Sequence, residues 1–421
     1  MDIGEKFHRF RYGGIILSMN RNMRHFQLGR VGVVLAAASL VLTALSISPS
    51  IAGAAKAKTP FRMLMIVAVT GPVAGPTAAE IQGTQAAVAL INKSGGMYGH
   101  RIVMTVANDN LDPTTALSEL QQAIGSNSKP NMVFAGTGSN ETLAMMPTLT
   151  RYKILSMQLA GSSIVDSPYQ FVLPNYIPTQ AQAVVASIVK NYPSAKNVGI
   201  IISNDAQGTA LLQYYQTALT KAGLTYNAQT FADTTTNVTP QLQALQATNP
   251  DVVIASGYGA VAGYILQDRA TLGWKVPVVG DGQLSANNLP ALVPSSALTG
   301  VSLIGMNSQV YAPLPTKSKA FQNFFLGITK QGADYSEPII LYSLAYDDLI
   351  LTQLAANQAK SIAAPAIAKA LEHLKQPKVK QYVSWSVEGF TPTIHVEQAP
   401  FTDYTLVSPF TKLGMYLPLS N

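Results

Sequence analysis

The stretch FRMLMIVAVTGPVAGPTAAEIQGTQAAVALINKSGGMYGHRIVMTVA, residues 61–107, decides the fold of this chain. Its first nine residues are an apolar run that stops at Thr70-Gly71-Pro72, which favours a strand. From 78 to 92 apolar side chains recur at helix spacing, and the glycines within 94–99 can adopt positive φ and end that helix before a second strand at 101–107. Strand, helix and strand in this order predict a parallel sheet with a crossover helix.

The same alternation continues along the chain and predicts two lobes. The first series adds helices at 113–125 and 140–151 and strands at 131–135 and 153–157, and the second has helices at 179–191, 207–222, 238–247 and 260–271 and strands at 197–203, 225–230, 251–255 and 276–280. We therefore expect an α/β protein with two parallel-type sheets, each buried on both faces.

After residue 300 the regular alternation of strands and helices ends. The pattern favours a strand at 301–306, helices at 317–331 and 339–356, and short strands within 381–410. One arrangement for this tail packs its helices on the first lobe and adds its strands to the second.

The composition excludes several classes of site and partner. The 421 residues are 48% hydrophobic and contain no Cys, which excludes disulfides, thiolate metal sites, a cysteine nucleophile and a lipid-anchored N-terminal cysteine. The formal net charge is +7, but six basic and two acidic residues lie before residue 56. The remaining +3 is too small and too dispersed to indicate nucleic acid.

The N-terminal residues 1–55 predict a leader. Three arginines between 21 and 30 precede an apolar run at 31–45 and a small-residue segment at 48–55, so we place cleavage near Ala55. The alternative is an uncleaved membrane anchor, and Met19 or Met23 would serve equally well as the first residue. In either case we expect an exported protein, periplasmic or on the outer face of the cell envelope.

The strongest enzyme signal is Gly257-Tyr258-Gly259-Ala260-Val261-Ala262-Gly263, which follows a predicted strand, opens a helix and precedes Asp281. This pattern is similar to a dinucleotide fingerprint, but its spacing is G-x-G-x-x-x-G and it lies late in the chain. Two S-x-x-K matches have no K-T-G partner, H-E-x-x-H is absent, and the histidines after the leader are scattered. We expect no enzyme, no cofactor and no metal.

Two loops at predicted strand ends are more informative. Residues 136–142, GTGSNET, offer backbone N–H groups and a serine hydroxyl at a helix start, which favours a carboxylate ligand. Residues 158–163, QLAGSS, follow the neighbouring strand at the same edge, where open α/β sheets bind ligands. The alternative for each serine is simple helix capping.

The ordered runs VAVTGP (67–72), GTQAA (83–87), INKSGGMYGHRI (91–102) and NDNLDP (108–113) resemble leucine/isoleucine/valine-binding proteins, the extracytoplasmic solute-binding proteins of ABC importers. The resemblance covers about 61–360. It implies a type I periplasmic-binding fold, with two Rossmann-like lobes joined by a three-strand hinge that closes on the ligand. We expect the first lobe to comprise 60–176 and 305–380, and the second 177–304 and 381–421.

The resemblance also implies a ligand site. Ser139 matches the serine that binds the ligand carboxylate, and Ala160 and Ser162 match a loop that holds carboxylate and ammonium. In the second lobe, Asp281 resembles the acidic partner of the ammonium, Tyr258 an aromatic wall, and Gln207 falls where many members have an aromatic residue. As alternatives, Asp281 is a turn residue between two glycines, and Tyr258 packs under the helix that follows.

The expected function is therefore capture of a small amino acid or related carboxylate by a monomer that presents it to an ABC-transporter membrane permease. A ligand-sensing receptor domain of the same fold is one alternative. A nucleotide-dependent enzyme is the other.

Overall fold

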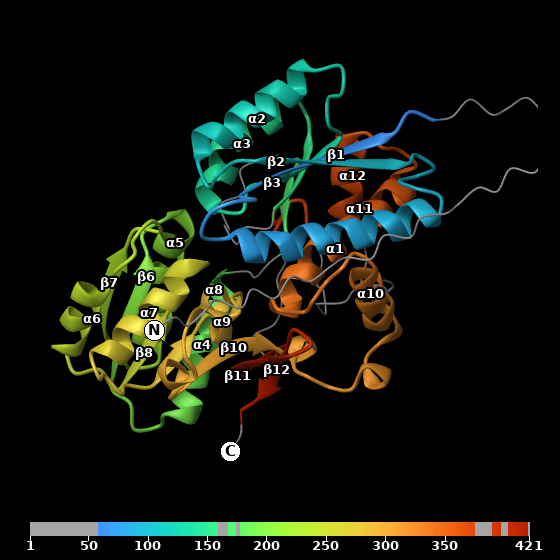
Figure 1. Ribbon diagram of the computed structural model, residues 1–421. Coiled ribbons are helices and arrows are strands. Elements are labelled where there is room, and N and C mark those ends of the chain that lie inside the picture. The colour runs from blue at the N-terminus through green and yellow to red at the C-terminus, as the bar shows by residue number, and fades with distance from the viewer. Residues whose placement is uncertain (1–57, 159–166, 174–176, 375–389, 397–402, 420–421) are drawn as a thin grey trace, which may run out of the picture. The chain divides into compact units, whose positions relative to one another are not determined.

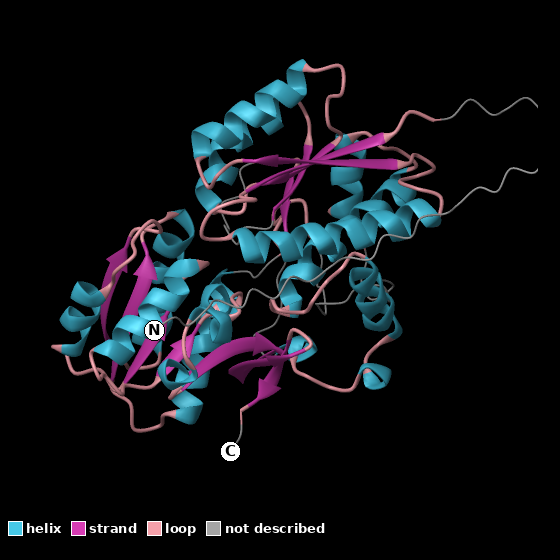
Figure 2. Cartoon of the chain, in the orientation of Figure 1, coloured by secondary structure: helices cyan, strands magenta, loops and turns pink. Residues whose placement is uncertain are grey.

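The computed structural model describes residues 58–158, 167–173, 177–374, 390–396 and 403–419. The leader predicted at 1–55 lies outside these residues. The described chain contains two sheets, and helices lie on both faces of each, as Figures 1 and 2 show. We call each sheet with its packed helices a lobe.

The first sheet is parallel throughout, in the order β2-β1-β3-β4-β5. Its strands are β1 (Phe61–Val67), β2 (Ile102–Asn108), β3 (Met132–Ala135), β4 (Leu155–Gln158) and β5 (Gln170–Val172). The helices packed with it are α1 (Ala74–Lys93), α2 (Pro113–Gly125), α3 (Ser139–Arg151), α10 (Lys319–Lys330), α11 (Ile339–Ala359) and α12 (Ala364–Leu371).

The second sheet is parallel from β7 to β10 and ends in an antiparallel pair, in the order β12-β11-β10-β9-β8-β6-β7. Its strands are β6 (Asn197–Ser203), β7 (Thr225–Phe231), β8 (Val252–Ala255), β9 (Val278–Gly280), β10 (Val301–Met306), β11 (Tyr404–Lys412) and β12 (Met415–Pro418). Its helices are α4 (Ile177–Asn191), α5 (Ala206–Lys221), α6 (Thr239–Gln246), α7 (Ala260–Thr271), α8 (Gly282–Ser285) and α9 (Leu289–Leu292), with short 3-10 turns at Ser295–Leu298, Asn307–Gln309 and Leu314–Thr316.

Strand β1 explains why both faces of the first sheet are buried. Met63 and Met65 belong to the core shared with α1 and α11, whereas Leu64 and Ile66 belong to the core under α2 and α3. Alternate side chains of a strand point to opposite faces, so an uninterrupted apolar run fits a strand covered on both sides. The α/β class predicted from this run is confirmed.

Helices α1 and α11 pack backbone to backbone. A Cβ on Gly83 would lie 1.9 Å from the carbonyl oxygen of Tyr342, so only glycine permits this approach. Helix α11 is also long and apolar enough to cross a membrane, but 89% of its most apolar stretch is buried inside the fold. It is therefore a core helix.

Some predicted boundaries were wrong. Helix α1 begins at Ala74, four residues before the expected start, because Pro76 lies in the first turn, where the missing N–H is not needed. Strand β5 and helix α12 were not predicted. Among the described residues the first strand of the tail is β11, from Tyr404, and much of the predicted stretch 381–410 lies outside them, at 375–389 and 397–402. The sequence predicts that the chain crosses between lobes at 176/177 and at 380/381. The first crossing adjoins residues 174–176 and the second falls within 375–389, both outside the described residues, so the lobe boundaries stay predictions.

Candidate functional site

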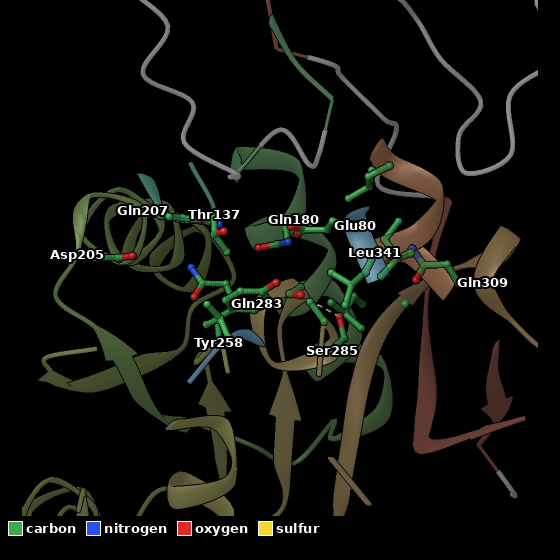
Figure 3. A pocket seen from close by; sticks show the side chains of 18 of the residues that line it. Glu80, Thr137, Gln180, Asp205, Gln207, Tyr258, Gln283, Ser285, Gln309 and Leu341 are labelled. Carbon is green, nitrogen blue, oxygen red and sulfur yellow. Dashed lines mark hydrogen bonds between the residues drawn. The ribbon is translucent and has the colours of Figure 1, made fainter. Parts of the chain in front are cut away.

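A cavity of about 130 Å³ lies where the carboxyl ends of strands from both sheets meet (Figure 3). Its walls come from the first lobe (Pro72, Val73, Glu80, Leu111, Thr137, Gly138, Ile340, Leu341 and Leu344), from the second (Gln180, Asp205, Gln207, Asp233, Tyr258, Gly282, Gln283, Ser285, Ala286, Ile304, Gly305, Met306 and Tyr404), and from Gln309 after β10. Open α/β sheets bind ligands at this end of their strands. The loops of two sheets therefore line one shared space.

The loop after β3 is shaped by local hydrogen bonds. Gly136 has φ +81°, and its backbone lies so close to Glu141 that an added Cβ would collide with it. The next residue, Thr137, lines the cavity, and its hydroxyl accepts a hydrogen bond of 3.0 Å from the Ala68 amide. This loop therefore holds its backbone against the cavity at the start of α3.

Ser139 and Gln207, two residues predicted for the site, are brought together. The Ser139 hydroxyl donates to Oε1 of Gln207 over 3.5 Å, and the serine is 1% exposed. Gln207 lines the cavity from the start of α5, whereas Ser139 lies just behind its neighbours Thr137 and Gly138. The ligand roles of both residues stay predictions.

Tyr258 lines the cavity on the loop between β8 and α7. Asn287 holds that loop: its Oδ1 accepts from the Gly259 amide at 2.7 Å, and its Nδ2 donates to the Gly257 carbonyl at 3.1 Å. The Tyr258 hydroxyl interacts with the Glu80 carboxyl of the first lobe, without the geometry of a full hydrogen bond. Burial, the largest cause, raises the pKa of Tyr258 well above its usual value, and Glu80 raises it further.

The glycines of 257–263 are explained by close packing. A Cβ on Gly257 would meet Ile265 at 2.9 Å, and one on Gly263 would meet Leu292 at 3.0 Å. Gly259 has φ +73°, and an added Cβ would lie 2.7 Å from the Pro72 carbonyl oxygen. Gly259 and Gly263 therefore have steric reasons that are independent of a nucleotide, whereas the end of the Ile265 side chain can move away from a Cβ at Gly257.

Asp281 is fully buried and does not line the cavity. Its Oδ1 caps α8 by accepting from the amides of Gln283 (3.0 Å) and Leu284 (3.1 Å), and its Oδ2 accepts from the Tyr215 hydroxyl (3.2 Å). Burial raises its pKa to about 6, against the lowering effects of Ser256, of the Tyr215 hydroxyl and of the two amides. This placement favours the turn alternative, and the ammonium role stays a prediction.

The predicted loop residues Ala160 and Ser162 lie outside the described residues. Their ligand roles stay predictions as well.

Glu80 is a cavity residue that sequence reasoning missed. It lies in the second turn of α1, is 5% exposed, and its Oε2 has no hydrogen-bond partner in the described part of the chain. Burial raises its pKa to about 8, Tyr258 opposes this shift, and Asp109 adds to it. The available signal was that Glu80 is the single acidic residue of the helix predicted at 78–92, among small and apolar neighbours.

The lining is acidic. Glu80, Asp205 and Asp233 contribute carboxyl groups, and none of the described lining residues is Lys, Arg or His. Burial raises the pKa of Asp233 to about 6, with Asp205 adding to the effect. Behind the lining, burial raises the pKa of Glu141 to about 7, with additions from Asp109 and Asp233. Within the described ranges, these acids form no group suited to holding a metal ion.

Comparison with protein families gives a match over residues 60–390 to a family described as periplasmic binding protein. A similar curated protein is the Leu/Ile/Val-binding protein homolog 3 of Brucella melitensis biotype 1, which is 25% identical over 258 residues, 58% of this chain and 67% of that one. The match to a second homologue of that organism, homolog 7, covers 63% of the relative's length.

Solved structures share the fold. A periplasmic binding protein type 1 from Bordetella pertussis Tohama I matches with a TM-score of 0.74 and 19% identity, over 86% of this chain and all of that one. The solute binding protein of an ABC transporter from Rhodopseudomonas palustris BisB5, in complex with 3,4-dihydroxy benzoic acid, matches with a TM-score of 0.68 and 18% identity, over 83% and 93% of the two chains. Both similarities concern the fold.

Proposed function

The chain belongs to the periplasmic binding protein family, and from this membership we propose that it is the solute-binding protein of an ABC importer. In this role it captures a small amino acid or related carboxylate outside the cytoplasm, as a monomer, and delivers it to a membrane permease. The leader predicted at 1–55 fits this location.

One observation carries the proposal: a single cavity is lined by polar groups from both sheets, at the ends of their parallel strands. Glu80 and Thr137 reach it from the first lobe, and Gln207, Tyr258 and Gln283 from the second. A solute bound there contacts both lobes at once, so binding favours a closed arrangement of the two.

The size of the cavity limits the solute. Its volume of about 130 Å³ is close to the roughly 150 Å³ of a protein cavity that admits benzene. A small solute fits this space, whereas a dinucleotide does not. This limit, and the packing role of the glycines at 257–263, argue against the nucleotide-dependent alternative.

A thermal-shift panel of amino acids, aromatic acids, amides and amines tests the proposal. A cognate solute at about 100 times its dissociation constant stabilises the folded state by roughly 2.7 kcal/mol. Titration calorimetry then gives the stoichiometry, which we expect to be one solute per chain. A panel without any stabilising compound would count against solute binding, and retention of a nucleotide through purification would favour the enzyme alternative.

Transport and sensing share this binding step. Reconstitution with its partner permease distinguishes the transport role from the sensing role. Only a transport protein stimulates solute uptake and ATP hydrolysis by the transporter. Failure to stimulate either activity, with solute binding intact, would favour the sensor.

A further inference from the structure

We propose that the solute carries a positively charged nitrogen, such as an ammonium or amidinium group, and that Glu80 of α1 receives it. This inference rests on the proposed solute-binding function and narrows its substrate class. It assigns the contact to a residue of the first lobe that the sequence comparison did not indicate, in place of Asp281.

The first support is an unsatisfied carboxyl group. Glu80 is 5% exposed and lines the cavity, and its Oε2 lacks a hydrogen-bond partner among the described residues. The nearby Tyr258 hydroxyl interacts with this carboxyl group without forming a full hydrogen bond, and it too has no hydrogen-bond partner in the described chain. A buried polar atom left without a partner destabilises the folded protein. A solute N–H group would remove that destabilisation.

The second support is a neighbouring acceptor in the same condition. Gln180, at the start of α4, is 1% exposed, and its Oε1 has no partner in the described chain. Figure 3 shows the Glu80 and Gln180 side chains directed into the same hollow. Two unsatisfied oxygens at one site match a group that donates several hydrogen bonds, as ammonium and amidinium groups do.

The third support is the charge of the lining. Its carboxyl groups are those of Glu80, Asp205 and Asp233, and its described members include no cationic side chain. A cation gains Coulomb energy from such surroundings, whereas an added carboxylate is repelled by them. The aromatic ring of Tyr258 also lines the cavity, and such rings attract cations.

Asp281 is less suited to this contact. Two amides of α8 and the Tyr215 hydroxyl already occupy its carboxylate, and it is fully buried behind the lining. A solute nitrogen could reach it only if these bonds were broken. Glu80 requires no such rearrangement.

Matched compounds test the inference by calorimetry. One set is L-leucine, isopentylamine and isocaproate, and the other is L-phenylalanine, phenethylamine and hydrocinnamate, in which the amine lacks only the carboxylate and the acid lacks only the nitrogen. We expect nitrogen-bearing members of at least one set to bind at least tenfold more tightly than the acid. An acid that binds as tightly as its nitrogen-bearing partners overturns the inference.

Variants locate the contact. Glu80→Gln keeps the shape and removes the charge, and should weaken binding of the nitrogen-bearing compound at least tenfold, with Glu80→Asp intermediate. The matched control is Glu119→Gln on α2, outside the cavity, which should bind as the wild type does. Unchanged binding in Glu80→Gln, or loss of binding in Asp281→Asn alone, overturns the assignment to Glu80.

The melting temperature of each variant without solute confirms that it is folded. Two failures are distinguishable. If an acid binds as tightly as its nitrogen-bearing partners, or if the only panel members that bind lack a cationic nitrogen, the inference fails and the proposed function stands. If nothing in the wider panel binds, both fail.

Discussion

The amide nitrogen of Ala260 donates a hydrogen bond to the carbonyl oxygen of Pro72, 3.1 Å away. Ala260 opens α7 of the second lobe, and Pro72 lies between β1 and α1 of the first. Both loops border the cavity, where Pro72 and Tyr258 are lining residues. This contact therefore links the two lobes beside the candidate site.

Gly259→Ala should weaken solute binding by about 1–3 kcal/mol. The alanine would be held at a positive φ that strains its backbone, and its Cβ would press on Pro72. Calorimetry with the solute identified in the panel measures the loss. Gly273→Ala is the matched control, since Gly273 also has positive φ (+63°) but nothing lies within 4 Å of its added Cβ. Equal affinities in the two variants would show that the Pro72 contact does not matter for binding.

Asp281→Ala should lower the free energy of unfolding by about 1–3 kcal/mol, because it removes the cap of α8 and the acceptor of the Tyr215 hydroxyl. Chemical denaturation measures this change. Asp281→Asn keeps a capping side chain and should retain solute affinity. A tenfold or greater loss of affinity in a folded Asp281→Asn protein would instead support the ammonium role predicted from sequence.

The affinity for a cationic solute should rise with pH. Glu80 has a pKa of about 8, raised chiefly by burial, so below this pH the protein must lose a proton to accept the cation, and affinity rises up to tenfold for each pH unit. The titratable groups that act on the Glu80 carboxyl are those of Tyr258 and Asp109, and the charge of Glu337 in turn raises the pKa of Tyr258.

Calorimetry between pH 6.5 and 8.5 tests this dependence. In Glu80→Gln the slope should be reduced to the contributions of Asp233 and Glu141, whose pKa values are about 6 and 7. The same slope in both proteins would exclude Glu80 as the titrating group.

Asp348 should make the protein less stable as the pH rises. It is fully buried in α11, neither carboxyl oxygen has a hydrogen-bond partner among the described residues, and burial, with Asp347 adding to it, raises its pKa well above the usual value. The folded state therefore holds a proton that the unfolded state releases above about pH 4, and folding loses free energy from that pH upward.

Asp348→Asn removes this titration. Its free energy of unfolding relative to wild type should increase from pH 4 to pH 8 by more than about 1 kcal/mol, as measured by urea denaturation. Asp112→Asn is the control: it lies at an exposed helix cap where hydrogen bonds from Thr115 lower the pKa of the carboxyl, so it titrates below pH 4 and its difference from wild type should stay nearly constant over this range. A constant difference between Asp348→Asn and wild type would mean that Asp348 is ionised in the folded protein.

The sheets were predictable because their signals are local. Each central strand is an apolar run that needs no knowledge of its neighbours, and the α/β alternation follows from it. Strand β5 was missed because its three residues become a strand only by pairing with β4. The antiparallel strands β11 and β12 depend on β10 in the same way, so the tail had no clear pattern of its own.

Two of the lining residues were indicated by the family resemblance rather than by the residue pattern alone. Tyr258 and Gln207 follow strands β8 and β6, and both line the cavity. Glu80 is different because it lies within a helix, and its direction depends on how α1 packs against α11 and the sheet. Asp281 also follows a strand, but the short helix after it turns the carboxylate inward, an effect of local geometry that spacing does not reveal.

The backbone contact between Gly83 and Tyr342 joins parts of the chain that are made at very different times. Until α11 emerges from the ribosome, the side of α1 that packs on it has no cover, so a nascent chain that ends before residue 339 cannot complete its first lobe. Contacts of such long sequence separation slow folding and leave apolar surface exposed to aggregation. The last fifth of the chain, from residue 339 onward, therefore controls when its beginning becomes native.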